Sequence, residues 1–229
     1  MSLRTVALTI VVITLTGCAV PQVSMTKQIQ SKIDRAEGIL TIPQNNLDVK
    51  VEATYTGDTG LLGALIGASI DSSRQSNAEK EAAPMIESLR DYDFRTVMLG
   101  ASTEALTNID QVKFVMPLRV DAVASDSAKR IAFDQSTSSA ILFNNVSYQL
   151  KSGNLIVTAK AEMYPKADTL KQFRNKPSET NPLDRGNVIY RKIFTFTKQA
   201  VTQTTIKDSL TEAATSIASQ LAADLNHGL

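Results

Sequence analysis

Two stretches of alternating residues, joined by a turn, constrain the fold of this chain more than any other feature. The side chains that share one face are Ala140, Leu142, Asn144, Val146, Tyr148 and Leu150 in the first stretch and Leu155, Val157, Ala159, Ala161 and Met163 in the second. Successive side chains of a strand point to opposite faces, so this period of two predicts two strands with one buried face each. Lys151-Ser152-Gly153-Asn154 supplies turn residues between them, and the segment is therefore predicted to be a β-hairpin.

Four further segments are predicted to be strands. Alternation marks residues 47–55 and 114–122, Ile131 to Phe133 is a short apolar run, and residues 188–197 are rich in β-branched and aromatic side chains. Pro117 lies inside the second segment and favours a sheet edge or a bulge, because proline cannot donate a hydrogen bond to the ladder. The last segment places three aromatic residues on one face, which makes it a candidate central strand: Tyr190, Phe194 and Phe196.

Helical spacing predicts three helices. Ser76 with Glu79 resembles a capping box ahead of Ile86 and Leu89, and Pro84 either kinks that helix or marks its first turn. Asp93 is a candidate N-cap for a second helix. The third starts near Thr205 and Asp208 and carries an apolar stripe: Ile206, Leu210, Ala213, Ala214, Ile217, Leu221 and Leu225.

This order of elements predicts an α+β fold over residues 46–229 as a single domain. We expect an antiparallel sheet of about five to six strands, with helices packed on it and the C-terminal amphipathic helix covering one face.

The N-terminus has the plan of a secretory signal. Arg4 precedes the uncharged apolar run from Thr5 to Thr16, which is shorter than the roughly 20 residues that span a bilayer as a helix. The run ends in Leu15-Thr16-Gly17-Cys18, which resembles the lipobox of bacterial lipoproteins at all four positions. The other interpretation is a plain secreted or N-terminally anchored protein in which the cysteine occurs by chance.

The lipobox resemblance implies a signal peptide over residues 1–17, cleaved between Gly17 and Cys18, and a diacylglycerol with further acyl chains on Cys18. Several acyl chains exceed the two signals needed for stable anchoring. Ala19 follows the cysteine where an aspartate commonly retains such lipoproteins at the inner membrane, so the resemblance implies the outer membrane, on its periplasmic side. Residues 18–45 are predicted to be the lipidated cysteine and a tether to the folded domain.

Composition excludes several classes of function. From Cys18 onward the chain carries 23 basic and 23 acidic residues, so no global field favours nucleic acid. Lipidation of the lone cysteine would leave no thiol, and His227 is the lone histidine. A histidine triad, a multi-histidine metal site and a cysteine metal site are thereby excluded, and we expect no cofactor.

Residues 60–70 are apolar on every side and place Gly60, Gly63 and Gly67 at spacings that allow close helix approach. One interpretation is a buried helix whose glycines accommodate the sheet. The other is contact with the membrane or with a partner helix, and both stay open at the level of sequence.

Two polar features are candidate contact or catalytic sites. The long connection from Lys166 to Asn187 carries Lys171, Arg174 and Lys176, which predicts a modest positive surface for an anionic glycan or an acidic partner, or simply a solvated loop. Asp91 and Asp93 lie two residues apart and could form an acid/base pair, although capping and solvation explain them.

The general plan also resembles envelope lipoproteins with a domain like the N-terminal domain of TolB, including auxiliary lipoproteins of ABC-type export systems and lipoprotein activators of cell-wall synthases. That resemblance implies a non-enzymatic accessory or scaffold protein of an envelope transport or cell-wall assembly, with an envelope protein as partner. The alternatives are binding of lipid or another small apolar ligand and, third, a carboxylate-dependent envelope hydrolase. The sequence does not indicate an oligomeric state.

Overall fold

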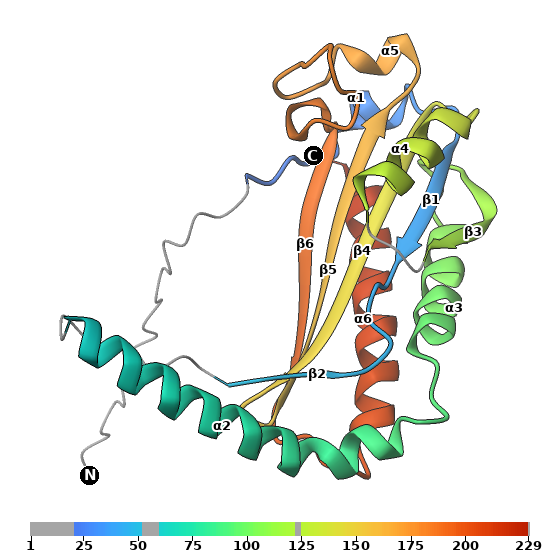
Figure 1. Ribbon diagram of the computed structural model, residues 1–229. Coiled ribbons are helices and arrows are strands. Elements are labelled where there is room, and N and C mark those ends of the chain that lie inside the picture. The colour runs from blue at the N-terminus through green and yellow to red at the C-terminus, as the bar shows by residue number, and fades with distance from the viewer. Residues whose placement is uncertain (1–20, 52–59, 122–124, 229) are drawn as a thin grey trace, which may run out of the picture.

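A computed structural model describes residues 21–51, 60–121 and 125–228, with the side chains of residues 60–70 left undescribed. Figure 1 shows a tall sheet with helices on both faces and at both ends. The elements in chain order are α1 (Lys27–Gln30), β1 (Ala36–Thr41), β2 (Asp48–Lys50), α2 (Gly60–Ser88), α3 (Phe94–Thr107), β3 (Phe114–Asp121), α4 (Asp126–Gln135), β4 (Ala140–Lys151), β5 (Asn154–Pro165), α5 (Asp168–Lys171), the short 3₁₀ helix η1 (Arg185–Asn187), β6 (Tyr190–Lys198) and α6 (Ile206–His227). None of the described helices combines the length and the apolar character that crossing a membrane requires.

The predicted hairpin is the spine of the sheet. β4 and β5 pair antiparallel along their full lengths, from Ala140 opposite Pro165 to Lys151 opposite Asn154. Ser152 and Gly153 form the turn with φ of 50° and 75°, the pair of positive values that a type I′ hairpin turn requires. The hairpin and its turn position are therefore confirmed, but near Ala140 both faces of the hairpin are buried, not one as predicted.

The sheet is mixed rather than purely antiparallel. Its strands follow the order β3-β1-β4-β5-β6, and β2 pairs with β4 off that path. β1 runs parallel to both β3 and β4, and β2 also runs parallel to β4, whereas β5 and β6 pair antiparallel. The α+β class, the six strands and the C-terminal helix are confirmed.

The large core lies between the sheet and the helices α3 and α6. All seven residues of the predicted stripe on α6 are buried, from Ile206 to Leu225. They pack on the even-numbered apolar residues of β4 and the odd-numbered ones of β5. Asp93 caps α3 as predicted, because its carboxylate accepts hydrogen bonds from the backbone of Arg95 and Thr96.

The folded domain begins well before residue 46, so the predicted tether is wrong over most of its length. Residues 36–41 form β1, whose neighbours are β3 on one side and β4 on the other. Val23 pairs with Arg191 in an antiparallel bridge, and Met25 and Ile29 are buried in the large core. Residues 18–20, which include the predicted lipid site Cys18, and Gly17 before them lie outside the described residues.

Several local predictions also need correction. Ile131 to Phe133 is not a strand but part of α4, which Ser125 caps through a hydrogen bond from the backbone of Ala128. Ser76 lies inside α2, which runs unbroken for 29 residues with Pro84 within it. The segment at residues 188–197 contains an edge strand, because β6 ends the strand order.

Of the two remaining predicted strands, one is present over part of its range and the other is present as an edge strand. The strand predicted at residues 47–55 is present at 48–50, and residues 52–59 lie outside the described part of the chain. β3 is an edge strand as Pro117 indicated, and its pairing with β1 shifts register beside that proline.

Candidate functional site

The face of the sheet opposite α3 and α6, here called the second face, carries a charged pocket. α4 and the connection between β5 and β6 cover part of this face over a small apolar cluster: Ile39, Ala132, Phe133, Ile141, Phe143, Tyr164 and Val188. Beside that cluster lies a pocket of about 690 Å³, which we call the charged pocket. Its lining comes from α4, from β5, from the turn before η1 and from η1 itself: Asp126, Lys129, Arg130, Lys160, Glu162, Tyr164, Asn181, Leu183, Asp184 and Arg185.

A buried carboxylate forms the floor of the charged pocket. Glu162 is 2% exposed, and its Oε1 accepts hydrogen bonds from Arg191 Nε at 2.9 Å and from Lys160 Nζ at 2.9 Å. Arg191 is 3% exposed and lies directly across the ladder from Glu162 on β6. Arg191 also donates a hydrogen bond to the backbone carbonyl of Arg185 at 2.7 Å, which ties the pocket floor to its rim.

The protonation states of the floor follow from these contacts. Burial by itself raises the pKa of Glu162, but the hydrogen bonds and positive charges of Lys160 and Arg191 outweigh it and hold that pKa below its ordinary value. Tyr164 stands two residues further along β5, and burial raises the pKa of its hydroxyl, with the Glu162 charge adding to the effect. The pocket therefore offers an ionised carboxylate and a protonated phenol around neutral pH.

The rim of the charged pocket carries two cationic side chains that do not bond to Glu162. Lys129 on α4 lies 5.7 Å from the ring centroid of Phe143 and takes part in no ion pair among the described residues. Arg185 is exposed, and its side chain is likewise free of ion pairs within the described part of the chain. Asp184 accepts a hydrogen bond from the backbone of Gly186 at 2.8 Å, which caps η1.

The connection from β5 to β6 is an arm held by internal hydrogen bonds, and most of its residues are exposed. The side chain of Asn187 is buried and bonds the backbone of Ser178 in both directions and the carbonyl of Asn181. Lys176 and Gly186 join the two limbs of the arm through a backbone hydrogen bond of 2.7 Å. A Cβ at position 186 would collide with the carbonyl of Lys176, so only glycine permits this closure.

The three predicted contact residues of this arm do not form one bare positive surface. Lys171 pairs with Asp168 at 2.7 Å, and Arg174 pairs with Glu179 at 2.8 Å. Lys171 and Arg174 do meet at a smaller pocket of about 240 Å³, together with Lys166 and Phe133. Lys176 is exposed and lines neither the charged pocket nor this smaller one.

Asp91 and Asp93 are both exposed on the surface of the protein. Neither lines the charged pocket or the smaller pocket at Lys171 and Arg174. The hydroxyl of Thr96 donates to Asp93 Oδ2 at 2.6 Å, and that bond, with the backbone bonds of the cap, lowers the pKa of Asp93. Within the described part of the chain, no cluster of His, Cys, Asp and Glu could hold a metal ion.

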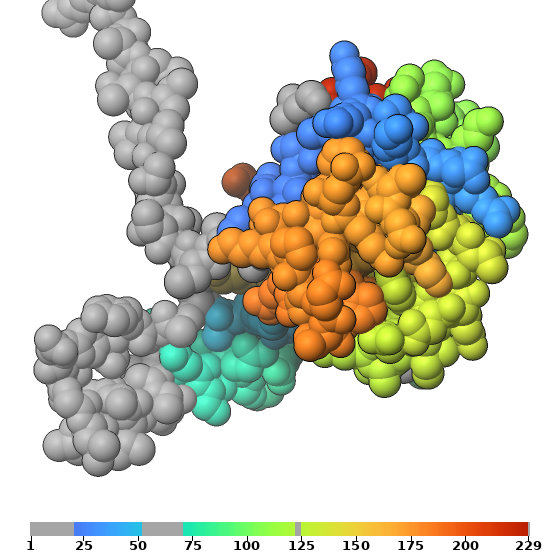
Figure 2. Space-filling view, turned by 90° about the horizontal axis from the view of Figure 1, so that it is seen from above, coloured from blue at the N-terminus to red at the C-terminus, as the bar shows by residue number. Residues whose placement is uncertain are grey.

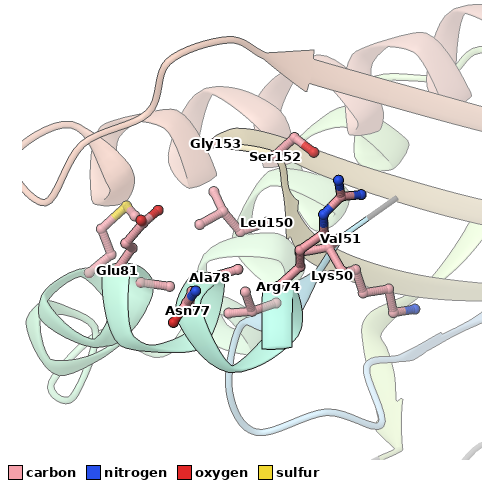
Figure 3. A pocket seen from close by; sticks show the side chains of 12 residues that line it. Lys50, Val51, Arg74, Asn77, Ala78, Glu81, Leu150, Ser152 and Gly153 are labelled. Atoms are coloured by element: carbon pink, nitrogen blue, oxygen red, sulfur yellow. The ribbon is translucent and has the colours of Figure 1, made fainter. Parts of the chain in front are cut away.

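A second groove, shown in Figure 3, lies at the other end of the sheet. It has a volume of about 490 Å³ and runs between α2, β2 and the hairpin turn, lined by Val49, Lys50, Val51, Arg74, Asn77, Ala78, Glu81, Ala82, Met85, Leu150, Ser152 and Gly153. Gln75 ties the helix to β2 by donating to the carbonyl of Val49 at 2.6 Å. Gly60, Gly63 and Gly67 lie in the first part of α2, but their surroundings are outside the described residues, so their contact role stays a prediction.

Sequence reasoning did not single out the residues of the charged pocket. Lys160 and Glu162 lie between the apolar positions of the predicted hairpin, and Arg191 lies in the predicted strand at residues 188–197, but the pattern assigns none of them a role. The available signal was a charged residue on each of two neighbouring strands, but pairing them requires the register of β5 against β6.

Comparisons with known proteins find low similarity. No protein-family model and no curated protein sequence matches the chain. The PelC dodecamer from Paraburkholderia phytofirmans is 13% identical with a TM-score of 0.36, covering 90% of this chain and 95% of that one. The hypothetical protein CT253 from Chlamydia trachomatis is 8% identical, with a TM-score of 0.35 and coverage of 84% and 98%. The LpoB C-terminal domain from Salmonella enterica is 11% identical, with a TM-score of 0.20 and coverage of 75% and 95%. Likeness at this level carries no argument about function.

Proposed function

We propose that this protein is a lipid-anchored lipoprotein of the bacterial outer membrane, on its periplasmic side, that acts without catalysis as an accessory or scaffold component of an envelope transport or cell-wall assembly. The charged pocket is the surface through which it binds its envelope protein partner. The observation that carries the proposal is the floor of that pocket, where a buried carboxylate is held by two cations on a rigid sheet.

The chemistry of the floor favours recognition over proton transfer. A general acid or base works best with a pKa near the working pH. The pKa of Glu162 is lowered and that of Tyr164 is raised, so neither group exchanges protons readily near neutrality. Fixed charges with fixed orientation instead select a complementary partner, because a mismatched charge would have to be desolvated without compensation.

The rim supplies the accessible part of the same site. Lys129 and Arg185 project from α4 and from η1, two elements on different walls of the charged pocket. Their guanidinium and ammonium groups fit a partner segment that carries carboxylates. Truncating charges at such a rim lowers the rate of association without disturbing the apolar core.

Co-purification from envelope membranes tests the partner. A C-terminally tagged chain is cross-linked and extracted in gentle detergent, and the double variant Lys129→Glu with Arg185→Glu is compared with a matched control, Lys80→Glu with Lys207→Glu. All four side chains are exposed or half-buried, and none forms an ion pair among the described residues. We expect a stoichiometric envelope partner with the parent and the control, and its loss with the pocket variant. Equal recovery with both variants would remove the pocket from the proposal, and a strictly monomeric parent would remove the partner.

The anchor has its own test. Cys18→Ser should abolish labelling by a fatty-acid probe and block normal processing of the signal peptide. Retained labelling would refute the lipobox assignment, and it would do so independently of the partner experiment.

A second candidate function is binding of a small apolar ligand in the groove of Figure 3. The observation that favours it is the apolar part of the lining, which α2 and the hairpin contribute: Val49, Ala78, Ala82, Met85 and Leu150. Mass spectrometry of natively extracted protein should then detect a co-purifying lipid that Ala78→Glu removes. Protein that carries no lipid after native extraction rejects this candidate.

A further inference from the structure

The folded chain starts very close to the predicted lipid site. The backbone of Val23 donates to the carbonyl of Arg191 at 2.9 Å and accepts from the backbone of Arg191 at 2.8 Å. Met25 and Ile29 are then buried, and Gln30 donates to the carbonyl of Leu225 at 2.7 Å. The chain is therefore fixed to the sheet from residue 23 onward.

Covalent geometry limits how far the domain can stand from its anchor. Val23 is the fifth residue after Cys18, and an extended chain spans at most about 3.5 Å per residue, so the reach is roughly 18 Å. Each strand of the hairpin has 12 residues. At about 3.3 Å per residue the hairpin is roughly 40 Å long, more than twice that reach.

The anchor leaves from the end of the sheet opposite the hairpin turn. Arg191 pairs with Glu162, near the end of β5 where Pro165 faces Ala140, while Ser152 and Gly153 turn the hairpin at the far end. Figure 1 shows α1 and α5 together at the first of these ends and α2 crossing the second. Seen from above in Figure 2, the segment after residue 20 and the arm between β5 and β6 lie side by side on one surface.

Charge divides between the same two ends. Residues 21–35 and 166–187, here called the anchor-proximal end, carry eight basic side chains and four acidic ones. Residues 71–93, which belong to α2 and the turn after it, carry six acidic side chains and three basic ones. The exposed lysines of the anchor-proximal end without an ion pair in the described part of the chain are Lys27, Lys32 and Lys176.

We propose that the anchor-proximal end docks on an anionic phospholipid surface and holds the sheet upright, with α2 and the hairpin turn directed away from the membrane. The inference rests on the lipid anchor of the proposed function. Each lysine near an anionic leaflet strengthens attachment about 5-fold, and the effect fades over a Debye length of roughly 8 Å. The acidic far end would be repelled only if it approached the same surface, which disfavours the inverted orientation, so the short reach and the charge division act in the same direction.

Lipid quenching tests the orientation. The acylated full chain is reconstituted into phosphatidylcholine vesicles with phosphatidylglycerol and headgroup-attached quenchers, and a fluorophore is placed by Lys32→Cys or by Ser152→Cys. We expect quenching at position 32 to exceed that at position 152 several-fold, and equal quenching at the two positions overturns the proposal. Intact mass reports acylation of Cys18 separately, so a failed anchor is distinguished from a failed orientation.

Charge variants test the chemistry of the docking surface. In the unacylated Cys18→Ser background, neutralising Lys27, Lys32 and Lys176 with glutamine should lower partition onto phosphatidylglycerol vesicles by about 100-fold, the product of three 5-fold effects. The matched control neutralises Lys50, Lys80 and Lys207, which are exposed away from the anchor-proximal end. We expect the control to partition like the parent. Equal losses in the two triple variants, or no loss in either, overturns the proposal.

Discussion

The two faces of the sheet are built from different chemistry. One face packs the apolar residues of β4 and β5 against α3 and α6 in a continuous core. The other carries a much smaller apolar cluster under α4, and beside it the buried pair of Glu162 and Arg191. The first face obtains its stability from area removed from water, which charge and pH barely affect. The second obtains a defined arrangement of charges that is sensitive to the loss of any one member.

This difference between the two faces indicates that the apolar face supports the fold and that the charged face is available for recognition. Buried ion pairs are frequently no more stabilising than apolar residues of similar volume, because both ions lose their hydration. Their effect is instead to fix geometry, here by aligning β5 with β6 and by tying the floor of the charged pocket to Arg185. The charged face is therefore where binding is expected, and the apolar face is where large losses of stability without loss of binding are expected.

The largest effect should come from breaking the buried ion pair on one side. Glu162→Ala leaves Arg191 buried without its carboxylate and is expected to cost about 4 kcal/mol in the free energy of unfolding. The double variant Glu162→Leu with Arg191→Met removes both charges, and we expect most of that loss to be recovered. Urea titration measures both. A double variant as unstable as the single one would show that packing, not charge, explains the loss.

The apolar face should respond almost as strongly but without an electrostatic signature. Leu210 on α6 is fully buried, and Leu210→Ala is expected to cost about 3 kcal/mol through lost burial and a residual cavity. Because no charge changes, the loss should be the same at low and high salt. A loss that depends on ionic strength would contradict the contrast between the two faces. Thermal unfolding at two salt concentrations provides the measurement.

The apolar face is also the part that the sequence predicts well. Its signals are periodic and local: alternate residues in the hairpin, a stripe on α6 and the cap of Asp93. The sequence pattern does not predict β1, because a parallel strand covered on both faces lacks alternation. Residues 36–41 therefore resemble an irregular segment at the end of a tether. Its neighbours in the sheet are distant in sequence, so their pairing depends on tertiary structure.

The charged face was not predictable for a related reason. Glu162 and Arg191 are 29 residues apart, and only the register of two antiparallel strands brings them together. The run from Ile131 to Phe133 does not identify α4, because three consecutive apolar residues are compatible with a short strand and are too few to show a helical period. The structure exposes Ile131 and buries the next two. A helix of 10 residues gives too few turns for its period to dominate.

Acidification should reduce the contribution of the charged face to the free energy of unfolding more than that of the apolar face. The pKa of Glu162 lies below its ordinary value of 4.5 in the folded chain, so its contribution to stability is complete above that value and is lost as the pH falls through the folded pKa. We expect the free energy of unfolding to fall less on acidification in the Glu162→Leu, Arg191→Met double variant than in the parent. Urea titrations from neutral pH to below pH 4.5 test this. Identical slopes in the two proteins would assign the acid sensitivity to other carboxylates.

The smallest effect is expected at Asp93, an exposed carboxylate that caps α3, one of the two helices on the apolar face. Asp93 caps α3 through backbone bonds from Arg95 and Thr96, and Asp93→Ala is expected to cost about 1 kcal/mol. Asp93→Asn keeps an acceptor at the cap and should recover most of the loss, whereas Asp91→Ala, a carboxylate with no capping contact among the described residues, should lie within about 0.5 kcal/mol of the parent. Because the cap is exposed and far from the charged pocket, none of the three variants should change recovery of the envelope partner. A loss of partner with Asp93→Ala at unchanged fold would instead assign a contact role to this end of α3.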